Sequence, residues 1–159
     1  MLLGTGFWGE EKVMKPLPIV NAFLVCDSAS RDSMTGKTSL FGIFKVIFTQ
    51  QLPVTHPSLV LYASLTEMEG EYELWVDVVH VPSNTRIARF PLPEQGMLKV
   101  TANNPLDYVE VVFDIRGLTF TEFGEHEFRL FIDGRPVALR RIWVKGIEDA
   151  PKELKEVLV

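Results

Sequence analysis

The stretch Gly124 to Val144 reads GEHEFRLFIDGRPVALRRIWV and decides how the rest of the chain is interpreted. Asp133-Gly134 stands between two runs of strand-forming residues. Asp-Gly is a favoured pair for a two-residue type I′ turn, because both central residues need a positive φ. Apolar residues before the turn recur at every second position, which excludes a helix. The stretch therefore predicts a β-hairpin.

The register of this hairpin follows from the turn. We expect four cross-strand pairs: Ile132 with Arg135, Leu130 with Val137, Phe128 with Leu139, and Glu127 with Arg140. This register places apolar partners on one face and opposite charges on the other, a charge pair being worth about 0.2–1 kcal/mol. A slip of one residue would turn the apolar set towards solvent.

Length and composition indicate one globular domain. The chain has 159 residues, of which 47% are hydrophobic and 23% charged. A chain of this size buries roughly 70% of its unfolded surface. The net charge is −5, whereas a nucleic-acid-binding protein is expected to carry a basic stripe. We therefore expect no nucleic-acid partner.

The cysteine count and the hydropathy pattern bear on the compartment. Cys26 is the only cysteine, so no internal disulfide forms, which fits a reducing compartment. Residues 1–3 are too short for a signal-peptide core, and no apolar run approaches the ~18–20 residues that span a bilayer. We expect a cytoplasmic protein without a membrane partner.

Short strands and turn signals follow one another along the chain. Residues 1–20 are interpreted as an N-terminal arm, with Met14 as an alternative natural start, residues 21–146 as the β-sandwich domain, and residues 147–159 as a tail or short helix. Besides the hairpin, the expected strands are 22–26, 39–48, 59–65, 71–81, 86–90 and 109–118. Residues 27–37 are expected to form a loop, and residues 91–105 to be irregular, with a short strand around Val100 left open.

This pattern lacks the alternation of strands and helices that a βαβ fold requires. It predicts an all-β, antiparallel two-sheet sandwich with an immunoglobulin-like closing hairpin, seven to eight strands and a short C-terminal helix. A closed barrel is the alternative.

Two glycine motifs resemble nucleotide-binding patterns, but they lack the neighbouring elements or residues that those patterns require. Gly4 to Gly9 fits G-x-G-x-x-G, but no strand precedes it and Pro16 and Pro18 leave no room for the helix that must follow. Gly36-Lys37-Thr38 resembles the end of a P-loop, but position 31 is arginine where that motif needs glycine. Neither motif predicts a cofactor, and we expect none.

The sequence contains no catalytic or metal-binding constellation that we recognise. His56, His80 and His126 lie on separate segments without ligand spacing. His80 and His126 fall on the apolar faces of their strands, so we expect paired core or edge histidines. Cys26 is expected to pack as a small apolar group. No G-x-S-x-G elbow is present, so no catalytic residue is assigned and the protein is expected to be a non-enzyme.

Three apolar residues stand where solvent is expected. Trp75 and Val79 occupy the polar face of the strand 71–81, and Phe131 the outer face of the hairpin. Large apolar groups at such positions mark contact surfaces. An equal alternative is that the N-terminal arm or the C-terminal tail covers them.

Several packing and turn positions together resemble a family of small single-domain bacterial proteins of unknown function. The resemblance covers roughly residues 22–145. It rests on the strand ending Cys26-Asp27, on Gly36-Lys37 followed by Leu40-Phe41-Gly42-Ile43-Phe44, and on Gly124-Glu125 leading to Asp133-Gly134. The resemblance implies a β-sandwich and brings no catalytic residues with it.

The leading hypothesis is a non-catalytic β-sandwich that binds a protein partner or itself through Trp75, Val79 and Phe131. The alternative is a hydrolase or metal-dependent enzyme that uses the loop 27–37, which requires Cys26 or a loop serine in contact with a histidine. A third hypothesis is a carbohydrate or small-ligand module that stacks its ligand on Trp8, Trp75 or Trp143.

Overall fold

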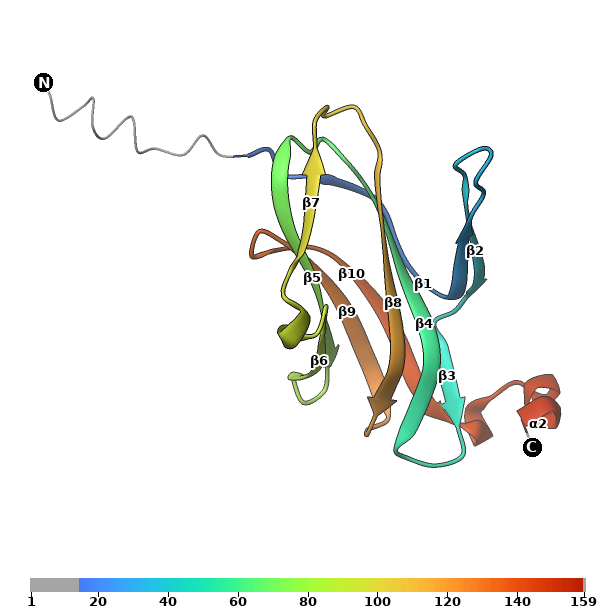
Figure 1. The fold of residues 1–159 in the computed structure, drawn as a ribbon. Helices are drawn as coiled ribbons and strands as arrows, with labels where there is room; N and C mark the ends of the chain where they lie inside the picture. The colour runs from blue at the N-terminus through green and yellow to red at the C-terminus, as the bar shows by residue number, and fades with distance from the viewer. Residues whose placement is uncertain (1–14, 159) are drawn as a thin grey trace, which may run out of the picture.

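Two β-sheets pack face to face in the computed structural model, which describes residues 15–158 (Figure 1). The predicted all-β two-sheet sandwich with a short C-terminal helix is confirmed. The strands are β1 (Ile19–Arg31), β2 (Thr38–Ile43), β3 (Val46–Thr49), β4 (Val54–Thr66), β5 (Gly70–His80), β6 (Thr85–Phe90), β7 (Leu98–Ala102), β8 (Val109–Phe120), β9 (Gly124–Ile132) and β10 (Arg135–Gly146). The helices are η1 (Pro93–Gln95), η2 (Ile147–Asp149) and α2 (Lys152–Leu158).

The first sheet has four strands in the order β2-β1-β4-β8. The second has six, in the order β3-β10-β9-β5-β6, with β7 also paired to β5. Neighbouring strands are antiparallel except β3 and β10, which are parallel. In Figure 1 the four-stranded sheet lies in front of β9 and β10, and α2 lies beyond the end of β10.

The core lies between the two sheets and is formed by every second residue of the long strands. The clearest case is β5, where Tyr72, Leu74, Val76 and Val78 are buried on one face. The opposite sheet contributes the alternating residues of β4 and β8, among them Leu61 and Ile115. This period of two is what the sequence pattern predicted.

The hairpin turn is confirmed, but its register is wrong beyond the first pair. Asp133 and Gly134 both have positive φ, 49° and 81°, and Ile132 pairs with Arg135. The physical reason for the difference is a β-bulge between Pro136 and Ala138, which places two residues of β10 opposite one of β9 and shifts every later pair.

The shifted pairs carry different chemistry. Leu130 faces Ala138, Phe128 faces Arg140, and Glu127 faces Arg141 instead of Arg140. Leu139 stands opposite Arg129 and is 51% exposed instead of buried.

The run 39–48 was expected to form one strand and is divided between the two sheets. β2 pairs with β1, whereas β3 pairs with β10. Gly42 lies just before this crossing with a φ of +67°, and a Cβ there would collide with the Asp27 carboxylate. Glycine at this position therefore allows the backbone of β2 to lie close to the Asp27 side chain.

Three further boundaries differ from the prediction. β1 extends from Ile19 to Arg31, so it begins within the expected arm and enters the expected loop 27–37. β4 begins at Val54 and contains Pro57, whereas the strand was expected to begin at Leu59. The early start of β1 is a pairing with β4, its late end a pairing with β2, and the early start of β4 a pairing with β8. A single segment of sequence does not reveal such pairings. The described residues form ten strands, where seven to eight were expected.

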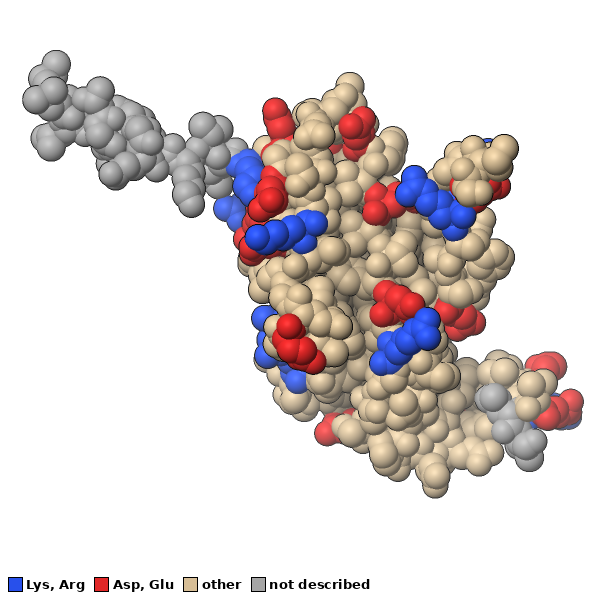
Figure 2. Space-filling view, viewed as in Figure 1, with Lys and Arg blue, Asp and Glu red and all other residues tan. Residues whose placement is uncertain are grey.

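The side of the molecule that carries the four-stranded sheet bears charged side chains in small mixed groups, without a broad area of one sign (Figure 2). None of the helices between residues 15 and 158 is long and apolar enough to cross a membrane.

Candidate functional site

The tip of the β9–β10 hairpin is fixed to the neighbouring strand β5. The Asp133 amide donates a hydrogen bond to the carbonyl of Glu73, 2.9 Å away, and the Glu73 amide donates one to Asp133 Oδ1, also at 2.9 Å. Lys15 Nζ lies 3.1 Å from Asp133 Oδ2. The turn therefore presents the outer face of the hairpin in a defined position.

Two of the three residues singled out in the sequence lie against each other on this outer face. The rings of Trp75 and Phe131 are stacked, with centroids 5.3 Å apart and an interplanar angle of 5°. The guanidinium of Arg89 lies 5.2 Å from the centroid of the Trp75 ring and forms two hydrogen bonds to Asp77, at 2.6 and 2.9 Å. The hydrogen bonds to Asp77 raise the pKa of Arg89 further above its usual value.

Val79, the third of these residues, lies on the same face but is only 5% exposed. It stands opposite Glu127 of β9, which is 6% exposed. Glu127 accepts a hydrogen bond from Arg129 Nε at 2.8 Å, and Arg141 Nε lies 3.3 Å from its other oxygen. Carboxylates buried at a sheet surface need such partners. In this part of the face the buried carboxylate of Glu127 is therefore paired with two arginines.

An open hollow of about 590 Å³ lies at the bulge and is lined mainly by apolar residues. Its apolar lining residues are Phe131, Pro136, Val137, Ala138 and Leu139, and the charged residues Glu127 and Arg129 also line it. The bulge creates this hollow, because it brings Leu139 to the outer face.

A second hollow of about 360 Å³ adjoins the first at Leu139 and is rich in positive charge. Its other lining residues are Lys45, Arg140, Arg141 and Trp143. Trp143 is 41% exposed. Arg140 Nε is buried without a hydrogen-bond partner.

Sequence reasoning missed Leu139 as an exposed residue because it assumed an unbroken ladder. One signal was present: Pro136 lies inside the predicted strand, and proline in sheets is confined to edges, strand starts and bulges. Trp143 had been named only as a platform for carbohydrate stacking.

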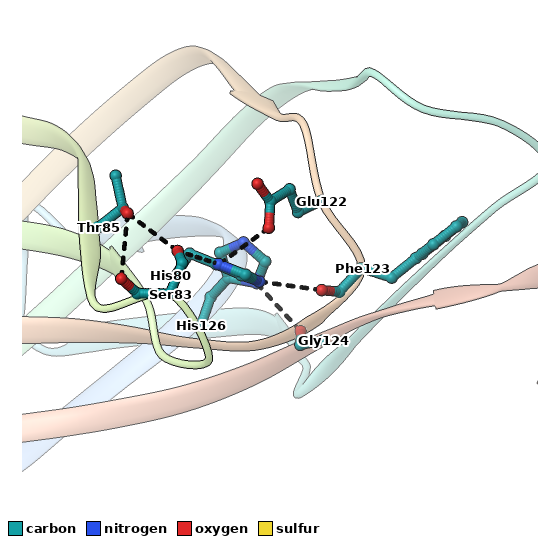
Figure 3. A network of polar contacts seen from close by, with 7 residues as sticks. All are labelled: His80, Ser83, Thr85, Glu122, Phe123, Gly124 and His126. Atoms are coloured by element: carbon teal, nitrogen blue, oxygen red, sulfur yellow. Dashed lines mark hydrogen bonds and ion pairs between the residues drawn. The ribbon is translucent and has the colours of Figure 1, made fainter.

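A cluster of polar contacts joins the end of β5 to the start of β9 (Figure 3). His80 Nδ1 lies 2.6 Å from Ser83 Oγ and 3.2 Å from Glu122 Oε2, and His80 Nε2 lies 3.1 Å from the carbonyl oxygen of Phe123. The His126 ring is 5.0 Å from that of His80. The expected pair of core histidines is confirmed, with exposures of 5% and 1%.

This cluster is better explained as structural than as catalytic. A serine–histidine–carboxylate relay places the serine and the carboxylate on opposite ring nitrogens, whereas Ser83 and Glu122 both lie at Nδ1 of His80. The carbonyl of Phe123 only accepts, so Nε2 carries a proton and is occupied. Burial lowers the pKa of His126, which keeps that ring neutral at physiological pH.

The loop 27–37 does not form the arrangement that the enzyme hypothesis requires. Cys26 Sγ donates to the carbonyl of Ser28 at 3.3 Å, and burial raises the pKa of its thiol. Asp32 accepts hydrogen bonds from the amides of Met34 and Thr35, which lower its pKa. Within residues 15–158 neither Cys26 nor a serine of this loop contacts a histidine, and no group of three potential metal ligands is found.

A third hollow, of about 370 Å³, lies where the chain crosses between the sheets. Asp27, Phe44 and His56 line it together with Leu154 of α2. The rings of Phe44 and His56 are 5.4 Å apart. Burial lowers the pKa of His56, and the negative charge of Asp27 opposes this shift.

The motif Gly4 to Gly9 and Trp8 lie outside the described residues. Trp75 and Trp143 do not form a joint platform. Trp75 is stacked on Phe131, whereas Trp143 lies in the basic hollow. Within residues 15–158, the carbohydrate hypothesis would therefore have to rely on Trp75 or Trp143 alone, because the two indoles lie in different surroundings.

Comparisons with known proteins place the chain in a family and give no activity. No curated protein matches the sequence. Among solved structures, the alkylpurine DNA glycosylase AlkC of Pseudomonas fluorescens bound to DNA superposes with a TM-score of 0.45 at 12% identity, covering 80% of this chain and 30% of that one. A β-glucosidase of Listeria innocua gives 0.47 at 12% identity, covering 87% and 17%. The chain thus spans less than a third of either protein.

At this distance neither structure carries an argument about function. The sequence itself gives a clearer answer, because residues 21–145 match the model of a family described as "Family of unknown function (DUF6941)". The predicted resemblance to an uncharacterised family is thereby confirmed. The chain belongs to this family of unknown function, DUF6941.

Proposed function

We propose that this protein is a protein-interaction module that binds a protein partner through the outer face of the β9–β10 hairpin. The observation that carries the proposal is the apolar hollow of about 590 Å³ between Phe131 and Leu139, which adjoins the exposed indole of Trp143. An aromatic or aliphatic anchor in such a pocket is the usual centre of a protein interface.

The composition of the surface supports the proposal. Phe131, Trp143 and the neighbouring arginines Arg129 and Arg141 are residue types that interfaces favour. On this face the N–H group of Trp75 Nε1 is buried without a hydrogen-bond partner. Of the three residues proposed from the sequence, Trp75 and Phe131 are partly exposed and can contact a partner, whereas Val79 is almost fully buried.

The four-stranded sheet offers a control surface. Val112 of β8 is 48% exposed, close to the 51% of Leu139, and belongs to the other sheet. A partner that binds the hairpin face responds to a charge at Leu139 and not to one at Val112.

The test compares three full-length proteins: the wild type, Leu139→Asp and Val112→Asp. Each is immobilised and exposed to a lysate of the source organism, and the affinity of the retained partner is measured. We expect Leu139→Asp to weaken binding at least about tenfold, which corresponds to ~1.4 kcal/mol, and Val112→Asp to leave it unchanged.

Sedimentation of the three proteins tests self-association, the other form of the hypothesis. A wild-type dimer that Leu139→Asp dissociates would make the partner a second copy of the chain. Loss of binding with Val112→Asp and not with Leu139→Asp would place the interface on the other sheet and overturn the proposal.

A further inference from the structure

The strand β10 is paired along only part of one of its edges. On one side β9 follows it from Arg135 to Val144. On the other side β3 pairs with it only from Trp143 to Gly146. Within residues 15–158, no strand pairs with residues 135–142 on that second side. We refer to this segment as the open edge of β10.

The backbone at the open edge points away from β9. The Trp143 amide donates to the carbonyl of Lys45 at 2.8 Å, so it faces the side of β3. The direction of backbone groups alternates along a strand. The amides and carbonyls of Arg141 and Leu139 therefore face the same side, where a further strand would satisfy them.

The side chains beside this edge carry uncompensated positive charge. Lys45 and Arg140 line the hollow of about 360 Å³ and form no ion pair with any residue between 15 and 158, whereas Arg141 is paired with Glu125 and Glu127. Arg140 Nε is moreover buried without an acceptor. A buried, unsatisfied donor is costly. In a chain of net charge −5, two unpaired cations at one hollow favour an anionic ligand.

We propose that the open edge of β10 binds an extended acidic peptide segment of a protein partner, which adds to the six-stranded sheet in line with β3. This inference rests on the proposed function and names the chemistry of the partner. The main chain of the segment pairs with Leu139 and Arg141. One of its carboxylates reaches Arg140 and Lys45, and an apolar side chain packs against Trp143.

A labelled peptide probes this site directly. The probe is a synthetic seven-residue peptide of alternating glutamate and valine, titrated into the full-length protein, with the lysine–valine peptide of the same length as control. We expect the glutamate peptide to bind at least about tenfold more tightly. Amide hydrogen exchange at Leu139 and Arg141 should slow in its presence. Equal binding of the two peptides, or unchanged exchange at both amides, would overturn the proposal.

Variants separate the backbone contribution from the charge. Leu139→Pro removes the amide that faces the open edge, at an edge position where proline is tolerated, while Leu139→Thr keeps it. We expect the proline variant to lose binding of the glutamate peptide and the threonine variant to retain it, with the two variants melting at similar temperatures. Arg140→Gln and Lys45→Gln should each weaken binding several-fold. The hydrogen-exchange measurement on the wild type remains decisive if the proline variant does not fold.

The outcome also distinguishes this inference from the proposed function. A partner that is lost with Leu139→Asp but retained by Leu139→Pro and by Arg140→Gln binds the hairpin face without adding a strand. That result would overturn the proposal that an acidic segment adds as a strand, and it would leave the proposed function intact. A dimer that the glutamate peptide dissociates would mean that a second copy of this chain occupies the edge, and would overturn the assignment to a separate partner.

Discussion

The histidine cluster and the open edge of β10 differ in whether their buried polar atoms have hydrogen-bond partners. Around His80 both ring nitrogens have partners, although the side chain is almost fully buried. At the open edge Arg140 Nε is buried and has none. Satisfied buried polar groups hold a fold in one arrangement, whereas unsatisfied ones raise its free energy until a ligand supplies the missing partner. The comparison supports a structural role for the histidine cluster, and it is the basis of our proposal that the open edge binds a partner.

The largest expected effect comes from removing the centre of the satisfied cluster. His80→Ala leaves the carbonyl of Phe123 without its donor and opens a cavity, so we expect the free energy of unfolding to fall by about 2–3 kcal/mol. Urea denaturation followed by circular dichroism measures it. Ser83→Ala, at an exposed position, should cost less than about 1 kcal/mol. Equal costs for the two variants would contradict the structural role assigned to His80.

The pH dependence of stability gives the next effect. Burial lowers the pKa of His126 in the folded state, so below the unfolded value of about 6.5 the unfolded chain binds a proton that the folded one excludes. Stability is therefore full above that pH and falls as the pH drops below it, by at most about 1.4 kcal/mol per pH unit for this group.

Denaturation between pH 5 and pH 8 measures this slope. His126→Gln, which keeps a donor for the carbonyl of Gly124, should reduce it. Burial lowers the pKa of His56 in the same direction, so His56→Gln serves to separate the two contributions. A wild-type stability that rises on acidification through pH 6 would contradict the assignment.

A smaller effect is expected on the outer face itself. Phe131→Ala removes the ring stacked on Trp75 and should lower the free energy of unfolding by about 1 kcal/mol. Phe131→Leu, which keeps apolar contact without the stack, is the matched control and should cost less. The same urea titrations measure both variants. A Phe131→Leu protein as stable as the wild type would show that the stack contributes nothing beyond apolar contact.

The smallest effect has the opposite sign. Arg140→Met removes a buried donor without a partner, so we expect the free energy of unfolding to stay constant or to rise by about 0.5 kcal/mol. Arg129→Met, which takes a partner from the buried Glu127 carboxylate, should instead lower it by about 1 kcal/mol. A decrease in the free energy of unfolding with Arg140→Met as large as that with Arg129→Met would show that Arg140 stabilises the fold.

The sequence predicted those features that depend on neighbouring residues. Asp133-Gly134 predicted the turn, and alternation predicted the buried face of β5, because both are local properties. The exposure of Leu139 depends on a bulge, which a ladder drawn from the turn does not contain. The division of the run 39–48 depends on two sheets competing for one apolar segment, since both β2 and β3 are strand-forming.

The proposed site was partly predictable for the same reason. Phe131 and Trp75 followed from period two, and the structure brings them together. The basic hollow joins Lys45 to Arg140 and Arg141 from β10. No spacing within the sequence relates these positions, because a parallel pairing of β3 with β10 brings them together.

The crossing of the chain at Phe44 and Lys45 has a consequence for cooperativity. The chain passes to the opposite layer five times, after β2, β3, β4, β7 and β8. Neither layer is therefore made from a continuous length of polypeptide, and neither has a self-sufficient segment that could melt first. A single all-or-none thermal transition, with equal calorimetric and van't Hoff enthalpies, is the behaviour that this interleaving dictates.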